Sequence, residues 1–239
     1  MCNLLVIGGS GHVGSLVLPS LAAAHNVRVF DLKPPASGPV VDYVAGNVCD
    51  PDAIFSACEG MDVLLYMAMG PANWHSPALI AGSFDANVKG VFLALEAAHR
   101  AGIKHAVYTS SMSVYDGDLF RRHFNDEDVT PDSTHVYGFT KLLGEECCRT
   151  ATRAWGMSVN ALRLCLPVAE EKWLAETRNG TPTIATTAED VARALLGAVD
   201  YEGNGFNAFM ISGDYEQKLM NMSKAKRALN WEPLARPNH

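Results

Sequence analysis

The chain has 239 residues, of which 48% are hydrophobic and 19% are charged, so it can bury a sizeable core and is not a disordered protein. Its 19 basic and 26 acidic side chains give a net charge of −7, which argues against a nucleic-acid-binding surface because such surfaces need clustered basic residues. No run approaches the roughly 18 uninterrupted apolar residues of a membrane span. The N-terminal stretch MCNLLVIGG lacks the basic segment of a signal peptide, so we expect a cytoplasmic protein.

The six cysteines and eight histidines show none of the spacings that are typical of metal sites. We therefore expect no metal. We also expect the cysteines to be reduced and mostly buried, as is usual in the cytoplasm.

Short β-rich runs alternate with longer helical patterns along the N-terminal two-thirds of the chain. The runs that predict strands are 3–7, 27–31, 42–45, 62–67, 105–110 and 159–164. The patterns that predict helices are 13–24, a helix beginning at Pro51, 77–101 and about 134–156. This order favours parallel strands covered on both faces, so we expect an α/β fold with a Rossmann-type doubly wound parallel sheet.

A polar loop covers about 116–133, and the C-terminal part of the chain is less regular. Residues 188–200 and 222–231 predict helices, and residues 205–212 predict a strand. We therefore divide the chain into a main domain, 1–165, and a small substrate lobe, 166–239, with elements that return to the core.

The sequence GGSGHVG, residues 8–14, follows directly on the first predicted strand. Gly8, Gly11 and Gly14 have the spacing G-x-x-G-x-x-G, and Gly9 also satisfies G-x-G-x-x-G. Glycine allows the tight turn, the close approach of the backbone to a pyrophosphate and the packing of the next helix on the strand. The N-terminus of that helix offers free N–H groups to phosphates. The pattern predicts that residues 1–165 bind a dinucleotide.

Asp31 ends the second predicted strand, about 20 residues after the glycine loop. A carboxylate at this spacing binds the adenosine ribose of a dinucleotide. Because it would repel a 2′-phosphate, NAD is favoured over NADP. Lys33 lies two residues further on and keeps NADP as the alternative.

The fifth predicted strand ends in YTSSMSVY, residues 108–115, which contains Ser111. Ligands of parallel sheets bind beyond the carboxyl ends of the strands, so Ser111 is expected on the active side. Tyr137 and Lys141 occupy positions i and i+4 of the following helix and therefore share one face. Such a pair alone is typical of any surface helix. Together with Ser111 and the glycine loop, it indicates a catalytic group.

The chain resembles the short-chain dehydrogenase/reductase superfamily, and within it the extended branch, the NAD-dependent epimerase/dehydratase family. The matching segments span nearly the whole chain in the family's order. They are the glycine loop, Asp31, GNVCD (46–50), NVKG (87–90), YTSSMSVY (108–115), YGFTK (137–141), LRL (162–164), AEDVARAL (188–195) and SKAKRALNWEP (223–233).

The resemblance implies that Tyr137 is the acid/base, that Lys141 also binds the nicotinamide ribose, and that Ser111 bonds to the reacting hydroxyl. A phenol has a pKa of about 10, and a nearby ammonium and a positively charged nicotinamide would both lower it. Tyr137 would then remove the proton of a secondary hydroxyl while its carbon gives a hydride to NAD.

The resemblance implies a wider set of site residues. The cofactor-binding positions are Gly8, Gly11, His12, Val13, Gly14, Asp31, Asn47, Val48, Ala68, Lys141 and Pro167; the candidate substrate residues are Ser111, Asn87 and Arg178. Asn87 is also a candidate for stabilising the active-site helix. Asn47 replaces the family's usual aspartate and Ile7 its usual threonine, and both changes leave the cofactor assignment standing.

The segment after Arg163 is shorter than in family members that act on nucleotide sugars. This compactness resembles uronate dehydrogenases, which oxidise free sugar acids. Arg178 would then hold the substrate carboxylate, and the alternative for it is a solvated arginine at a helix end. Trp74 and His75 either line a substrate pocket or pack within a loop.

The sequence therefore favours an NAD-dependent oxidoreductase or epimerase that acts on a secondary hydroxyl of a sugar or sugar derivative. A uronate-type dehydrogenase is the close alternative, because all these reactions use the same three side chains. A non-catalytic dinucleotide sensor is the alternative of another class. The resemblance also implies a homodimer formed through the helices of 77–101 and 134–156.

Overall fold

A central parallel sheet organises the fold. The computed structural model describes residues 1–36, 38–39, 41–71, 73–181 and 183–237, apart from the side chain of residue 179. Its sheet has seven strands in the order β3-β2-β1-β4-β5-β6-β9, and neighbouring strands pair in parallel. The strands are β1 (Asn3–Ile7), β2 (Asn26–Asp31), β3 (Asp42–Ala45), β4 (Val63–Tyr66), β5 (His105–Ser111), β6 (Ser158–Leu164) and β9 (Phe206–Ile211). The predicted fold class is confirmed.

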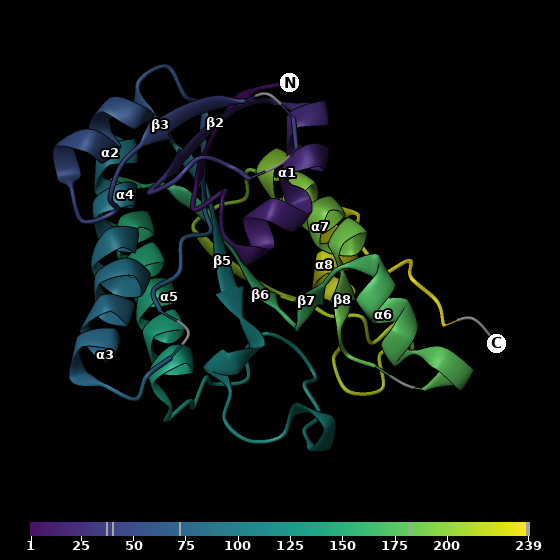
Figure 1. The fold of residues 1–239 in the computed structure, drawn as a ribbon. Coiled ribbons are helices and arrows are strands. Elements are labelled where there is room, and N and C mark those ends of the chain that lie inside the picture. Colours follow the sequence, from purple (N-terminus) through teal and green to yellow (C-terminus); the bar gives the residue numbers. More distant parts are fainter. Residues whose placement is uncertain (37, 40, 72, 182, 238–239) are drawn as a thin grey trace.

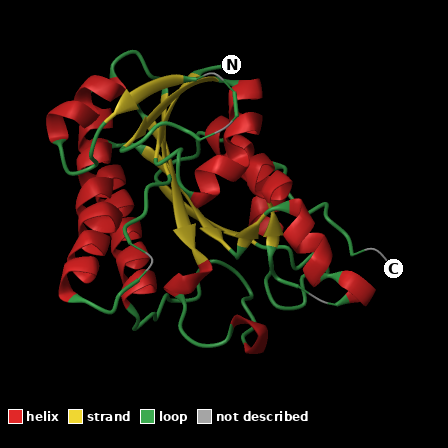
Figure 2. Ribbon diagram, viewed as in Figure 1, coloured by secondary structure: helices red, strands yellow, loops and turns green. Residues whose placement is uncertain are grey.

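Helices cover both faces of this sheet, as Figures 1 and 2 show. One side carries α1 (His12–Ala24), α7 (Ala188–Asp200) and α8 (Ser223–Leu229). The other carries α2 (Pro51–Cys58), α3 (Pro77–Phe84), α4 (Gly90–Arg100) and α5 (Val136–Trp155). The helices thus form two layers with the sheet between them.

The residues of β1 illustrate why both layers are needed. Leu4 and Val6 belong to the apolar core that includes residues of α1 and α7, whereas Leu5 and Ile7 belong to the core that includes residues of α2 and α4. Successive residues of a strand point to opposite faces, so a strand that is apolar throughout must be covered on both sides.

The strand order reverses between β1 and β4. The chain runs from β1 outward to β2 and β3, then returns to β4 and continues through β5 and β6 in the opposite direction. At such a switch point a crevice opens beyond the carboxyl ends of the strands. The glycine loop follows β1 and therefore lies at this crevice.

The chain after residue 165 returns to the sheet. β9 pairs with β6, and α7 packs against α1 on the sheet face. The predicted strand and the two predicted helices of this part are present, with ends that differ by at most a few residues. Between β6 and α7 the described residues form four short elements that the sequence did not predict. They are β7 (Pro167–Val168), α6 (Glu170–Glu176), a 3-10 turn (Arg178–Gly180) and β8 (Thr186–Thr187).

The long helix predicted for 77–101 is present as α3 and α4, which are joined by a π-helical turn, Asp85–Lys89. By length and composition alone this stretch could cross a membrane, because Pro77–Arg100 has 24 residues and a mean hydropathy of 1.4. In the fold it packs against α2 and α5 as part of the helical layer.

Candidate active site

A cavity of about 1100 Å³ lies beyond the carboxyl ends of the strands. Its wall runs from the glycine loop after β1, past the ends of β2 and β4, to the chain that follows β6. Cavities for one small ligand typically measure about 300–1,000 Å³. This cavity therefore has room for a ligand as large as a dinucleotide.

Glycine lets three backbone segments converge at one end of the cavity. Gly8 has a φ of +86°, and a Cβ there would lie 2.3 Å from the backbone nitrogen of Ala68. A Cβ on Gly14 would lie 2.4 Å from the carbonyl oxygen of Gly9, so α1 begins tightly against the loop. Gly11 is the N-cap residue of α1. The free N–H groups of this helix end fit a pyrophosphate.

Asp31 stands at the end of β2 on the cavity wall. Its Oδ2 accepts a hydrogen bond of 2.9 Å from the backbone N–H of Ser10, and its Oδ1 accepts one of 2.7 Å from that of Leu32. These bonds fix the carboxylate beside the glycine loop. Asn47 and Val48 line the same end of the cavity. The arrangement fits the adenosine half of a dinucleotide.

His12 joins the two sides of the cavity. Its Nε2 donates a hydrogen bond of 3.2 Å to the carbonyl oxygen of Pro167, which lies in β7 just beyond the end of β6. Both residues line the cavity, as does Val13. The cofactor positions predicted on either side of the cavity are therefore in contact.

Ser111, Tyr137 and Lys141 meet at the other end of the cavity. Ser111 is the last residue of β5, and Tyr137 and Lys141 lie at the start of α5. The Ser111 hydroxyl lies near the Tyr137 phenol and lowers its pKa. Lys141 Nζ lies 6.0 Å from the Tyr137 ring centre and donates a hydrogen bond of 2.8 Å to the carbonyl oxygen of Thr109. The three predicted catalytic side chains thus share one corner.

Two glycines of α5 explain how this helix comes so close to β5. A Cβ on Gly138 would lie 1.9 Å from the carbonyl oxygen of Ser113, and one on Gly144 would lie 2.2 Å from the Tyr108 hydroxyl. Sequence reasoning missed both. Glycine inside a helix costs about 1 kcal/mol relative to alanine, so the glycine directly after Tyr137 was a usable signal for close packing.

Burial shifts the two titratable groups of this corner in opposite directions. It raises the pKa of Tyr137 above its ordinary value, and the neighbouring Ser111 hydroxyl works against that rise. It lowers the pKa of Lys141 from 10.5 to about 8, against the influence of Cys148 and Glu145.

Asn87 and Arg178 are not among the described residues that line the cavity. Asn87 is buried in the π-helical turn, where its Oδ1 accepts a bond of 3.0 Å from the Gly70 N–H and its Nδ2 donates one of 2.9 Å to Thr140 Oγ1. It therefore ties the chain after β4 to α5. Arg178 is exposed in a short 3-10 turn after α6.

Trp74 packs against the ring of Tyr137. The two ring centres are 5.7 Å apart, the planes are inclined by 24°, and Trp74 lines the cavity. Its Nε1 donates a hydrogen bond of 3.0 Å to Ser83 Oγ in α3. The sequence left open whether Trp74 lines a pocket or packs within a loop. In the structure it lies on the cavity wall.

The doubly wound sheet and the cavity at its switch point define a Rossmann-type fold with a dinucleotide-binding site. The model of the NAD dependent epimerase/dehydratase family matches residues 4–209, and the chain belongs to that family. The predicted family, NAD as its cofactor and the predicted enzyme type are thereby confirmed.

Relatives and solved structures agree with this assignment. A 3 beta-hydroxysteroid dehydrogenase/Delta 5-->4-isomerase from Mycobacterium tuberculosis is 38% identical over 172 residues, which are 67% of this chain and 46% of the relative. A uronate dehydrogenase from Pseudomonas putida is 28% identical over 171 residues, 68% of this chain and 60% of the relative. The structure of MoeE5 in complex with UDP-glucuronic acid and NAD superimposes with a TM-score of 0.81 and 20% identity, over 98% of this chain and 94% of MoeE5.

The matched segment covers less than two-thirds of either relative, 46% of the first and 60% of the second. The relatives also differ in substrate, as their names state. The reaction and substrate of this chain are therefore not defined by these relatives.

Proposed function

We propose that this protein is an NAD-dependent oxidoreductase or epimerase that acts on a secondary hydroxyl of a sugar or sugar derivative. The observation that carries the proposal is the meeting of Ser111, Tyr137 and Lys141 at one end of a cavity whose other end holds the glycine loop and Asp31. A non-catalytic dinucleotide sensor would need only the end of the cavity that binds the dinucleotide. The presence of Ser111, Tyr137 and Lys141 together at the other end therefore favours an enzyme.

Two observations support NAD as the ligand at the end of the cavity that contains the glycine loop and Asp31. The glycine loop brings backbone so close that a Cβ at Gly8 or Gly14 would clash, which leaves N–H groups at the start of α1 for a pyrophosphate. The Asp31 carboxylate, fixed by two backbone N–H groups, would accept hydrogen bonds from the adenosine ribose and repel a 2′-phosphate.

Three side chains of this protein would bind the substrate hydroxyl and accept its proton. Ser111 holds the substrate hydroxyl by a hydrogen bond, and the Tyr137 phenolate accepts its proton. Lys141 stabilises that phenolate by its charge and binds the ribose hydroxyls next to the nicotinamide. Bound NAD supplies the acceptor for the hydride that leaves the same carbon.

A sugar-like substrate is supported by the names of the relatives and structural neighbours, which include uronate dehydrogenases and sugar epimerases. The uronate alternative predicts a cation for the substrate carboxylate. Arg178, the candidate for that role, is exposed and lies outside the described wall of the cavity.

A product assay separates the reactions that this site can perform. The protein is incubated with NAD and a panel of free sugars, uronic acids and nucleotide sugars, and NADH and product stereochemistry are measured together. Net NADH indicates a dehydrogenase, and an isomerised sugar without net NADH indicates an epimerase. If the purified protein binds NAD but converts no secondary alcohol, the proposal is wrong.

A further inference from the structure

Exposed apolar side chains flank the catalytic corner. Met69 is 47% exposed and Leu166 is 57% exposed, and both line the cavity. Met69 follows β4 and Leu166 follows β6, so they lie on either side of Ser111 at the end of β5. Large apolar side chains that remain exposed around a cavity mark a surface that a ligand covers.

The backbone holds Leu166 in this exposed position. Its φ is +42°, a left-handed conformation that is costly for a bulky residue and that clusters at ligand sites. The carbonyl oxygen of Leu166 accepts a hydrogen bond of 3.2 Å from the N–H of Thr186 in β8. The short β7–β8 pair, which adjoins Leu166, therefore presents this side chain to the cavity.

Trp74 supplies a flat apolar wall on the same side as Met69. Its ring lies against Tyr137, and its Nε1 bonds to the buried Ser83. The Ser83 hydroxyl is within 3.1 Å of the Leu79 carbonyl oxygen, so the partner of the indole is itself held in α3. An indole fixed in this way offers its remaining surface to the face of a ring-shaped substrate.

Few charged side chains lie on the cavity wall near Met69, Trp74 and Leu166. Lys172 Nζ is 3.7 Å from Glu176 Oε1 on α6, and both side chains are exposed to solvent. Asp31 lies by the glycine loop, and the carbonyl oxygen of Asp85 is within 3.8 Å of Cys49, beside Asn47 and Val48. Lys141 is 3% exposed and faces Tyr137 and Thr109. A charged group of the substrate would be desolvated next to Met69, Trp74 and Leu166, which is costly.

We propose that the substrate end of this cavity selects an uncharged ring that carries a secondary hydroxyl at its edge and presents an apolar face to Trp74. Met69 and Leu166 cover the rest of that ring, and Trp74 is the residue that determines specificity. This inference rests on the proposed function and narrows it, because it disfavours free sugar acids and nucleotide sugars relative to neutral rings of the same shape.

Two pairs of matched probes test the inference. The first pair is trans-4-methylcyclohexanol and trans-4-hydroxycyclohexanecarboxylate, and the second is methyl β-glucopyranoside and its uronate. Within each pair the two probes differ in a charged group at one ring position. With NAD present, we expect the neutral member of a pair to have the higher kcat/KM by at least about tenfold, since one apolar group in a fitted pocket is worth this much.

Variants of Trp74 link the preference to the residue. Trp74→Ala should raise KM for the neutral probe about tenfold or more and leave NADH affinity unchanged, and Trp74→Phe should restore part of the loss. Trp155→Ala is the matched control, because Trp155 stacks on His99 at 5.3 Å on the outer helical layer and is not among the described residues of the cavity wall. Binding is followed in parallel by the fluorescence change that each probe causes, which Trp74→Phe should abolish.

The outcomes separate the two levels of the account. Preference for the carboxylate members, equal use of both, or no binding by either neutral probe would overturn the substrate class. An unaffected KM in Trp74→Ala would overturn the role of Trp74. Binding of neutral rings that depends on Trp74 but yields neither NADH nor an isomer would leave the substrate class standing and contradict the proposed hydride transfer.

Discussion

Among single residues, Lys141 has the strongest conflict between burial and charge in the site. Its side chain is 3% exposed, and burial lowers its pKa from 10.5 to about 8. Its Nζ donates to the Thr109 carbonyl oxygen, and Cys148 and Glu145 favour its charged form. A lysine that is charged at neutral pH and yet desolvated suits the role proposed for Lys141, the stabilisation of a transient phenolate.

This burial has a consequence for stability. Between pH 8 and 10.5 the unfolded chain binds a proton at Lys141 that the folded chain has lost, so the lysine's contribution to stability rises with pH in this window. Below pH 8, burial of the Lys141 ammonium lowers the free energy of unfolding by on the order of 3 kcal/mol. Lys141→Met should therefore be more stable than wild type at pH 7, and this advantage should shrink as the pH approaches 10.

Urea unfolding of both proteins at several pH values measures this difference. Other groups titrate in the same range, but they are common to both proteins and cancel in the comparison. A stability difference that stays constant from pH 7 to pH 10 would show that Lys141 does not titrate with a lowered pKa.

Much of the site could be predicted at the level of residues. Ser111, Tyr137 and Lys141 follow from a strand end and from an i, i+4 pair on one helix, which are local relations. The stacking of Trp74 on Tyr137 could not be predicted, because it depends on the course of the loop after β4 and on the bond to Ser83. The exposed position of Leu166 could not be predicted either, because it depends on the hydrogen bond between Leu166 and Thr186 in β8.

Among the elements, α5 is held to the sheet by a buried ion pair. Arg163 in β6 donates hydrogen bonds of 2.9 and 2.8 Å to Glu145 in α5. Ser110 in β5, the residue before Ser111, donates a further hydrogen bond of 2.7 Å to Glu145. Because Glu145 lies one helical turn after Lys141, this cluster sets the position of α5 along β5 and β6.

Removing one partner of this pair should be costly. Glu145→Gln leaves the Arg163 guanidinium buried without its counter-charge, and we expect a loss of about 3–5 kcal/mol in the free energy of unfolding. Glu146→Gln is the control, since Glu146 pairs with Arg149 at the surface and such pairs contribute about 0–1 kcal/mol.

Denaturant unfolding of the two variants under the same conditions makes the comparison. Equal losses for Glu145→Gln and Glu146→Gln would contradict the anchoring role of the buried pair.

The elements that could not be predicted are the short ones. β7 and β8 have two residues each and α6 has seven, so none contains enough sequence to show a period. The π-helical turn in the long helix was also missed, because it depends on the contacts of Asn87 with Gly70 and Thr140 rather than on local propensity.

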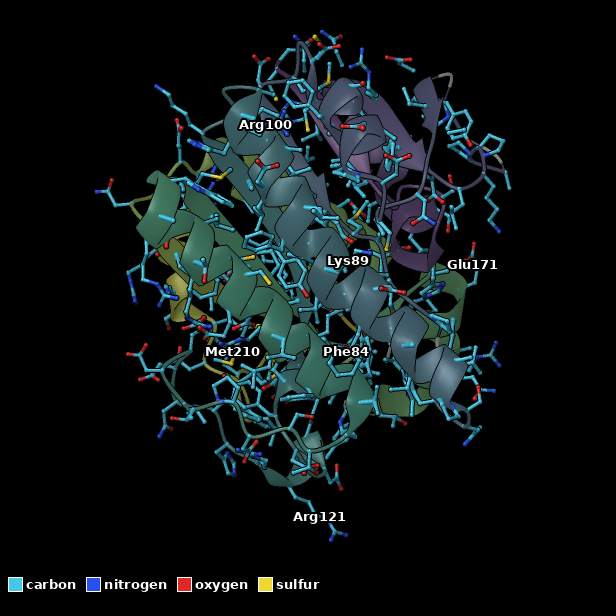
Figure 3. All side chains as sticks on the ribbon, turned by 90° about the vertical axis from the view of Figure 1, so that its left-hand side faces the viewer. Phe84, Lys89, Arg100, Arg121, Glu171 and Met210 are labelled. Atoms are coloured by element: carbon cyan, nitrogen blue, oxygen red, sulfur yellow. The ribbon has the colours of Figure 1, made fainter. Side chains whose placement is uncertain are left out.

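At the scale of the whole molecule, the layer that contains α4 and α5 is the surface through which a homodimer is predicted. In Figure 3 the long helix that contains Phe84, Lys89 and Arg100 runs alongside α5, and both helices face the viewer. Phe92 on α4 and Phe139 on α5 are 40% and 41% exposed. The homodimer through this layer stays a prediction, and these exposed aromatic side chains give positions at which it can be tested.

Phe92→Glu should weaken the predicted dimer, because it would place a charge in the predicted interface. Sedimentation velocity should show a dimer for wild type and a larger monomer fraction for the variant. Phe120→Glu is the control, since Phe120 is 53% exposed in the loop after β5. Identical sedimentation of wild type and Phe92→Glu would contradict an interface at this layer.

The architecture as a whole was predictable because strand–helix alternation and right-handed crossovers leave few arrangements of a parallel sheet. The place of β9 beside β6 was not, because the segment between α7 and β9 carries no signal for which strand it joins. This late strand completes the sheet on the side where β7 and β8 shape the substrate end.

The central claim is that Tyr137 accepts the proton of the substrate hydroxyl. Its most direct test is the rate of NADH formation by Tyr137→Phe with the best substrate of the panel, together with the affinity for NADH. We predict that kcat/KM falls by about a hundredfold to ten-thousandfold and that NADH affinity is unchanged, because the variant removes only the acid/base group. Turnover equal to that of wild type would contradict the account.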